Sequence, residues 1–227
     1  MKGSGGWSAD ALDAFRKQDL PAGATVNGAV SKMDELAPYV GPVVRAFGSD
    51  TAKSYQRDLS KFIDREHKTV SSLTGELKWN YADGLATMNT ARAQGAAGFL
   101  AKAGAVATEN LRISLQNEFG TVTAVSLDDQ PIASSKKILL QVMTQEQPTG
   151  FKAESGTITA LGGAPFGVRS IQGTVEFKLS GGGAAPVVTA LDENGYPSNK
   201  AVNSKAGDGG AVQLPLLEDV VYYVIVR

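Results

Sequence analysis

The sequence contains no cysteine, and His67 is its single histidine. Without thiols the chain can hold no disulfide framework, no thiolate-bound metal and no cysteine nucleophile. One histidine also excludes a multi-histidine metal centre within the chain, and any histidine-dependent triad would have to use His67. Its neighbours are charged (Asp64, Arg65, Glu66 and Lys68) and no nucleophile-elbow sequence lies nearby, which favours a solvated surface position.

The chain also lacks a basic excess and a long apolar run. Its net charge is −1 and its pI is about 5.9, whereas a general nucleic-acid binder is normally basic. No segment approaches the roughly 20 apolar residues of a membrane span. The first six residues are small and polar, and no apolar run follows them, so no signal peptide is visible. We therefore expect neither a nucleic acid nor a membrane as a partner.

Hydrophobic residues make up 42% of the chain, which is enough to form a core. From Thr69 to Arg227 the sequence consists of short alternating segments separated by Gly, Asn and Asp turns. This spacing is typical of antiparallel sandwiches and barrels. The predicted fold class is mainly β, an antiparallel, jelly-roll-like β-sandwich with a short α-helical N-terminal extension. The expected division is a linker at 1–7, the helical or irregular extension at 8–57 and the sandwich at 58–227.

Individual segments can be assigned within this division. In the extension we expect helices near residues 8–21 and 27–38, and an extended stretch at 39–47; residues 50–65 fit either a helix or a loop and strand. Leu77–Tyr81 alternates and is followed by an Asp83-Gly84 turn, which predicts a hairpin with residues 85–90. Further strands are expected at 97–100, 111–118, 121–127, 137–144, 157–161, 172–179, 186–191, 211–214 and 220–226.

Aromatic side chains are the best candidate ligand contacts. Trp79 and Tyr81 share strand parity, so they should lie on one face of the sheet, with Glu76 and Asn89 as polar neighbours. Tyr196 follows the Asn194-Gly195 turn and should be exposed at a loop tip. Exposed aromatic rings suit the apolar faces of sugars, but a tryptophan in a sandwich strand can equally belong to the core, and an exposed tyrosine can serve a protein contact.

Carboxylates decide whether the chain could be an enzyme. Glycoside hydrolysis needs two carboxylates facing each other across the scissile bond. Most of the candidates lie in predicted turns, where Asp is favoured because it binds nearby backbone amides; they are Glu76, Asp83, Asp128, Asp129, Asp192 and Glu193. We prefer the interpretation that these carboxylates stabilise turns, and we therefore assign no catalytic residue.

No cofactor is indicated beyond the option of a structural calcium ion. Calcium needs six to eight oxygen ligands, and no EF-hand-like spacing occurs. The weak candidates for such a site are Asp128, Asp129 and Asp192.

Several ordered motifs resemble the C-terminal β-domains of bacterial glycoside hydrolases of the TIM-barrel type. They are SLTGELKW (72–79), NTARAQGAAGFL (89–100), SLDDQPI with SSKKILL (126–140) and VTALDENG (188–195). The likeness covers about residues 58–227, and Ala91 stands where the family pattern has proline. In such enzymes the catalytic carboxylates lie in a preceding barrel, so the resemblance implies an accessory module.

These observations lead to one expected function and two alternatives. The expected function is a non-catalytic accessory module of a bacterial glycoside hydrolase that binds polysaccharide through exposed aromatics. Its partners would be the polysaccharide and the adjacent catalytic domain, and its location would be extracellular or periplasmic. The alternatives are a purely structural domain that packs on the barrel or on itself, and a small β-sandwich glycosidase or lyase.

Overall fold

The computed structural model describes residues 34–43, 58–180, 186–207 and 211–227, and the chain divides into the units Met1–Ile63 and Asp64–Arg227. In the first unit, helix α2 spans Ala37–Val40, with Pro38 in its first turn. The extended stretch predicted from Tyr39 is therefore wrong at its start, because proline is well suited to a first helical turn. The helices predicted at 8–21 and 27–38 lie almost entirely outside the described residues.

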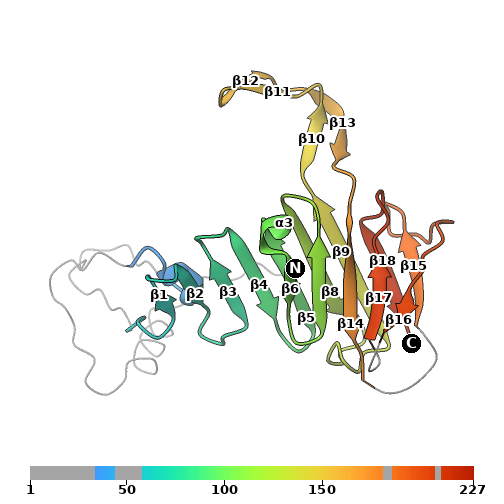
Figure 1. Ribbon diagram of the computed structural model, residues 1–227, viewed down its shortest axis with the longest axis horizontal. Coiled ribbons are helices and arrows are strands. Elements are labelled where there is room, and N and C mark those ends of the chain that lie inside the picture. Colours follow the sequence, from blue (N-terminus) through green and yellow to red (C-terminus); the bar gives the residue numbers. More distant parts are fainter. Residues whose placement is uncertain (1–33, 44–57, 181–185, 208–210) are drawn as a thin grey trace, which may run out of the picture. The chain divides into compact units, whose positions relative to one another are not determined.

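The second unit is mainly β and antiparallel, as predicted. The larger sheet of the chain has nine strands in the order β1-β2-β3-β4-β5-β8-β9-β18-β15, and β1 begins at the last residue of the first unit (Figure 1). Their bounds are Ile63–Asp64 (β1), Thr69–Ser71 (β2), Leu77–Asn80 (β3), Leu85–Asn89 (β4), Ala93–Gly98 (β5), Gly120–Ser126 (β8), Lys137–Thr144 (β9), Tyr222–Val226 (β18) and Val187–Leu191 (β15).

A second sheet has five strands in the order β16-β17-β14-β7-β6. Their bounds are Lys205–Ala206 (β16), Ala211–Pro215 (β17), Gly173–Lys178 (β14), Leu111–Leu115 (β7) and Ala105–Ala107 (β6). The predicted strands at 137–144, 172–179 and 211–214 thus match β9, β14 and β17 closely. Their side chains alternate between buried and exposed, as expected of strands with one face on a core.

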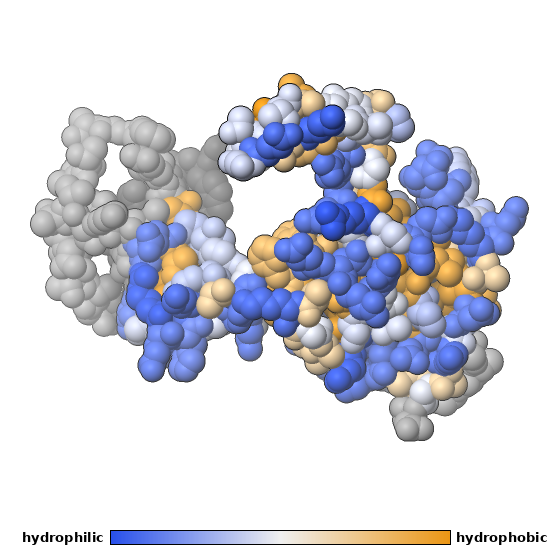
Figure 2. All heavy atoms as spheres, turned by 45° about the horizontal axis from the view of Figure 1, so that its top comes forward, coloured by the Kyte–Doolittle hydropathy of each residue, from blue (hydrophilic) through white to orange (hydrophobic). Residues whose placement is uncertain are grey.

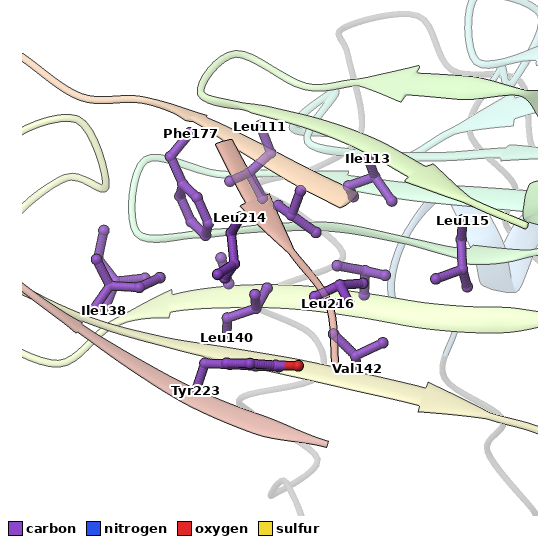
Figure 3. Close-up of a cluster of buried hydrophobic side chains, with 14 of the residues drawn as sticks. Leu111, Ile113, Leu115, Ile138, Leu140, Val142, Phe177, Leu214, Leu216 and Tyr223 are labelled. Atoms are coloured by element: carbon purple, nitrogen blue, oxygen red, sulfur yellow. The ribbon is translucent and has the colours of Figure 1, made fainter. Parts of the chain in front are cut away.

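The hydrophobic core lies between the two sheets. Figure 3 shows residues of β7, β14 and β17 pointing toward residues of β9 and β18. In the larger sheet the buried members of the core come from the half that runs from β5 to the edge strand β15, and none of them lies on β2 or β3. Fully buried members include Leu111, Ile113, Ile138, Leu140, Phe177, Leu214 and Tyr223. This contact between sheets defines the sandwich.

The strand predicted at 97–100 is wrong in its bounds. Strand β5 ends at Gly98, and helix α3 spans Leu100–Ala103. Gly98 has φ +135°, and a Cβ atom there would collide with the carbonyl oxygen of Gly84. Because only glycine fits this conformation, the strand ends here and the chain turns into α3.

A two-part ribbon connects β9 to β14 (Figure 1), and we call residues 146–168 the arm. Strand β10 (Glu146–Thr149) pairs with β13 (Gly163–Val168), and β11 (Lys152–Glu154) pairs with β12 (Thr157–Ala160). Every side chain of β11 and β13 is exposed. Of these strands the sequence predicts only the one at 157–161, because proline, glycine and the missing alternation hide the others.

Candidate functional site

The structure brings Trp79 and Tyr81 together near the end of β3. Their ring centroids are 5.5 Å apart and the rings are tilted by 52°. Tyr81 lies just beyond the strand, where its N–H donates to the carbonyl of Lys68 at 3.0 Å. Both side chains are half-buried. The predicted neighbourhood of the two aromatics is thus present, but the tilted rings do not form one flat surface.

The pairing register places Trp79 on the outer face of the larger sheet. Trp79 lies opposite Ala86, which lies opposite Ala97. The neighbouring residue Ala96 belongs to the core, and successive side chains of a strand point to opposite faces. Trp79 therefore does not lie between the two sheets. Its cross-strand neighbour Val70 is only 2% exposed.

Glu76 and Asn89 lie together, but on the opposite side of the sheet from the aromatics. The N–H of Asn89 donates to the carbonyl of Glu76 at 2.8 Å. Asn89 pairs with the buried Gln94, on the face that carries the core. Its side-chain oxygen accepts a hydrogen bond from the N–H of Glu109 at 3.0 Å. The structure therefore does not place Glu76 and Asn89 as neighbours of Trp79 and Tyr81.

Tyr196 lies at an exposed turn, and its side chain is 69% exposed. The carboxylate of Asp192 forms the turn by accepting hydrogen bonds from the N–H groups of Asn194 (2.9 Å) and Tyr196 (2.8 Å). Gly195 has φ +86°, a left-handed conformation that suits glycine. The turn residues thus hold the tyrosine at the surface.

A cleft of about 830 Å³ lies beside this turn. Its lining comes from the end of the arm, the connection from the arm to β14, the end of β15 with the loop that follows it, and the 218–221 loop. The lining residues are Val168, Arg169, Ser170, Ile171, Leu191, Asp192, Glu193, Ser198, Lys200, Glu218, Asp219 and Val221. Four carboxylates and two cations therefore face one space, bordered by the turn that carries Tyr196.

The polar groups of the cleft hold one another in place. Lys200 forms an ion pair with Asp219, with Nζ 2.6 Å from Oδ2, and this contact lowers the pKa of Asp219. The hydroxyl of Ser170 donates to Glu218 Oε2 at 3.1 Å. Asp192 and Glu193 are candidate carboxylates from the sequence alone, whereas Arg169, Lys200, Glu218 and Asp219 are not. They come from three separate loops, and no local motif marks them.

Asp128 organises the loop between β8 and β9. Its carboxylate accepts hydrogen bonds from the hydroxyls of Ser135 (2.7 Å) and Ser126 (2.9 Å) and from the N–H of Lys136 (2.6 Å). These bonds, the one from Ser135 foremost, hold the pKa of Asp128 well below its ordinary value. Such a carboxylate stays ionised and stabilises the loop, which agrees with the prediction that Asp128 binds nearby backbone groups in a turn.

The other candidate acids are also tied to nearby groups. Asp83 accepts hydrogen bonds from Lys102 Nζ (2.8 Å) and Asn80 Nδ2 (2.8 Å), which together lower its pKa. Asp129 forms an ion pair with Arg92. Within the described ranges, no three His, Asp or Glu side chains gather as they would around a metal ion. A calcium site at Asp128, Asp129 or Asp192 stays a prediction.

His67 lies in an exposed turn, as expected from its charged neighbours. Its ring Nδ1 is 2.7 Å from Asp64 Oδ2, and its backbone N–H donates to Asp64 Oδ1 at 2.9 Å. These bonds stabilise the turn between β1 and β2 and explain the lowered pKa of Asp64.

Comparison with known proteins adds no family: no family model, no curated protein and no solved structure matches this chain.

Among the described residues, no helix has both the length and the apolar character required to cross a membrane.

Proposed function

We propose that this chain is a non-catalytic accessory module that binds polysaccharide, with Tyr196 and the adjacent cleft as the principal contact. The observation that carries the proposal is a 69%-exposed tyrosine in a turn bordering a cleft of about 830 Å³. Sugar rings present apolar C–H faces and a rim of hydroxyls. The ring of Tyr196 can pack against the apolar face of a sugar. The carboxylates of the cleft, Lys200 and Ser198 can form hydrogen bonds with its hydroxyls.

The aromatic pair on β3 offers a second contact. The ring of Trp79, on the outer face of the larger sheet, has its centroid 5.5 Å from that of Tyr81, just beyond β3. A long polysaccharide can touch more than one aromatic along its length. Because both rings are half-buried, we assign this pair a smaller share of the binding than Tyr196.

The motifs at 72–79, 89–100, 126–140 and 188–195 support the wider context. They resemble the C-terminal β-domain of TIM-barrel glycoside hydrolases, and the mainly β fold of residues 64–227 is compatible with it. We propose that the chain belongs beside such a catalytic domain, in an extracellular or periplasmic setting.

The carboxylates favour binding over hydrolysis. A glycosidase general acid needs a raised pKa so that it carries a proton near neutral pH. Asp83 and Asp128 instead have lowered pKa values, because neighbouring groups donate hydrogen bonds to their ionised forms. Asp192 is engaged by backbone N–H groups of its own turn. A shallow contact of this kind gives modest affinity, since little ligand area is buried.

The test is affinity electrophoresis through gels containing plant, algal and microbial polysaccharides. The wild-type chain is expected to be retarded in at least one gel. Tyr196→Ala should abolish most of the retardation, and Trp79→Ala should reduce it less. Phe166→Ala is the matched control, because Phe166 is 61% exposed but lies on the arm. Mobility unchanged in every gel would refute the proposal.

A second candidate function is structural docking. Several large apolar side chains are exposed on the sheets and the arm, among them Leu77 (50%), Val187 (66%) and Leu161 (75%). Figure 2 shows apolar residues interrupting the hydrophilic surface. If no polysaccharide retards the chain, contact with a neighbouring domain through such residues becomes the preferred function.

A further inference from the structure

The outer part of the arm is a two-stranded sheet of β11 and β12. In the described part of the chain, β11 and β12 pair only with each other, and every side chain of β11 is exposed. A two-stranded ribbon is at best marginally stable in water, whereas three or more strands support one another. The outer edge of β11 is therefore a place where another strand would add stability.

The turn of this ribbon shows which backbone groups are unpaired. Ser155 and Gly156 both have positive φ, +49° and +80°, and Glu154 lies opposite Thr157. This is the pattern of a two-residue type I′ hairpin, in which the pair flanking the turn is hydrogen-bonded. Alternate residues of a strand direct their N–H and C=O groups to opposite sides. The backbone groups of Ala153 therefore point away from β12.

The charges beside Ala153 are self-complementary. Lys152 and Glu154 flank it on the same strand, and both are exposed. If two copies of β11 pair antiparallel with Ala153 opposite Ala153, each Lys152 lies opposite the Glu154 of the other copy. Two opposite-charge pairs form about a two-fold axis, which is the arrangement that a symmetric dimer requires.

The other face of the ribbon is apolar at the same position. Ala153 lies opposite Ile158, whose side chain is 55% exposed. Pairing about Ala153 would line up Ile158, Ala153, Ala153 and Ile158 across the four strands. Apolar area would then be removed from water in both copies.

We infer that the arm is a self-association surface, and that its partner is the arm of a second copy of this chain. The two β11 strands join edge to edge, which gives a four-stranded sheet in the order β12-β11-β11-β12. Few residues of each chain take part, fewer than in a standard-sized interface, so the association is weak and depends on concentration. This inference does not depend on polysaccharide binding.

The test is sedimentation equilibrium of the full chain from low to high micromolar concentration. The wild-type chain is expected to show a reversible monomer–dimer equilibrium. Lys152→Glu or Glu154→Lys places like charges opposite each other at both symmetry-related pairs of the dimer. Each single variant should therefore have a dimer dissociation constant raised by roughly tenfold or more. The double variant K152E/E154K restores opposite charges and should associate like the wild type.

A mixture of the two single variants separates pairing from damage to the fold. In the mixed dimer each new charge lies opposite a complementary one, so an equimolar mixture should associate more strongly than either variant alone. Glu146→Lys is the matched control, because it reverses an exposed charge on β10 of the same arm and should change nothing. A wild-type chain that stays monomeric throughout would overturn the inference. So would single variants that associate like the wild type, or a mixture that stays monomeric.

Discussion

The sandwich and the arm are built from the same kind of strand but are stabilised by different means. In the sandwich, β9 and β14 bury every second side chain between two sheets. In the arm, β11 and β13 bury none. The sandwich is therefore stabilised by burial of apolar area, whereas the arm depends on its backbone ladder and turn residues. Substitutions should separate these two sources of stability.

The largest expected difference concerns two phenylalanines. Phe177→Ala, at a residue that is 1% exposed in β14, should destabilise the chain by about 3–5 kcal/mol, because it leaves a cavity between the sheets. Phe166→Ala, at a residue that is 61% exposed in β13, should change stability by no more than about 0.5 kcal/mol. Urea unfolding measures both. Equal effects would mean that the arm packs against something in solution.

A smaller effect is expected from one hydroxyl at the edge of the core. The ring of Tyr223 is fully buried, and its oxygen accepts a hydrogen bond from the N–H of Leu217 at 2.7 Å. Tyr223→Phe removes this acceptor and should cost about 1–2 kcal/mol in urea unfolding. Tyr222→Phe is the control, because Tyr222 is the half-buried neighbour on the other face of β18.

Tyr223 also predicts a dependence on alkaline pH. Burial raises the pKa of Tyr223 to about 12, from an ordinary value of 10.0. The neutral form is favoured in the folded chain, so its contribution is complete below pH 10 and is lost as the pH rises toward 12. The free energy of unfolding of Tyr223→Phe should fall less steeply than that of the wild type as the pH rises from 10 toward 12. A slope identical to that of the wild type would contradict the assignment.

The smallest expected effect is a change in Tm when the carboxylate that organises the loop between β8 and β9 is replaced. The turn of the arm, which uses no carboxylate, is the region compared with it. The pKa of Asp128 is lowered by hydrogen bonds to its ionised form, so its contribution is present above the ordinary Asp pKa of 3.8 and is lost as the pH falls below it. Asp128→Asn should lower Tm by a few degrees at neutral pH, and the difference from the wild type should shrink in acid.

The adjacent Asp129→Asn is the control for this measurement. Asp129 pairs with Arg92 at the surface, and an exposed ion pair contributes little. The Ser155–Gly156 turn of the arm depends on positive φ angles and not on a carboxylate. Hydrogen exchange at that turn should therefore be unaffected by either substitution. If Asp129→Asn has the larger effect on Tm, the role assigned to Asp128 is wrong.

The strands that pack on the core were the most predictable part of the fold. Residues 137–144 alternate in hydrophobicity and form β9 with the predicted bounds. Strand β13 was not predictable, because Gly163–Val168 carries no alternation and no buried side chain. Apolar and polar residues alternate along a strand when one of its faces is buried. Strand β13 has no buried face, so its sequence shows no such alternation.

The candidate site was predictable only in its turns. The Asn194-Gly195 sequence indicated an exposed Tyr196, which the structure places 69% exposed. Arg169, Lys200 and Glu218 are isolated charges in the sequence, and they meet only because three loops converge at one cleft. Glu76 and Asn89 are close to Trp79 in the sequence but lie on the other face of the sheet.

The sequence by itself determined the mainly β class, because alternation and turn residues act over a few neighbouring positions. It also determined where several turns form, since Asp, Asn and Gly favour the required local hydrogen bonds and φ angles. Only the tertiary structure decided that Trp79 lies outside the core, that distant loops enclose a cleft, and that β11 pairs with no strand other than β12 among the described residues. These features depend on which strands pair, and strand pairing is chosen by contacts between residues far apart in the chain.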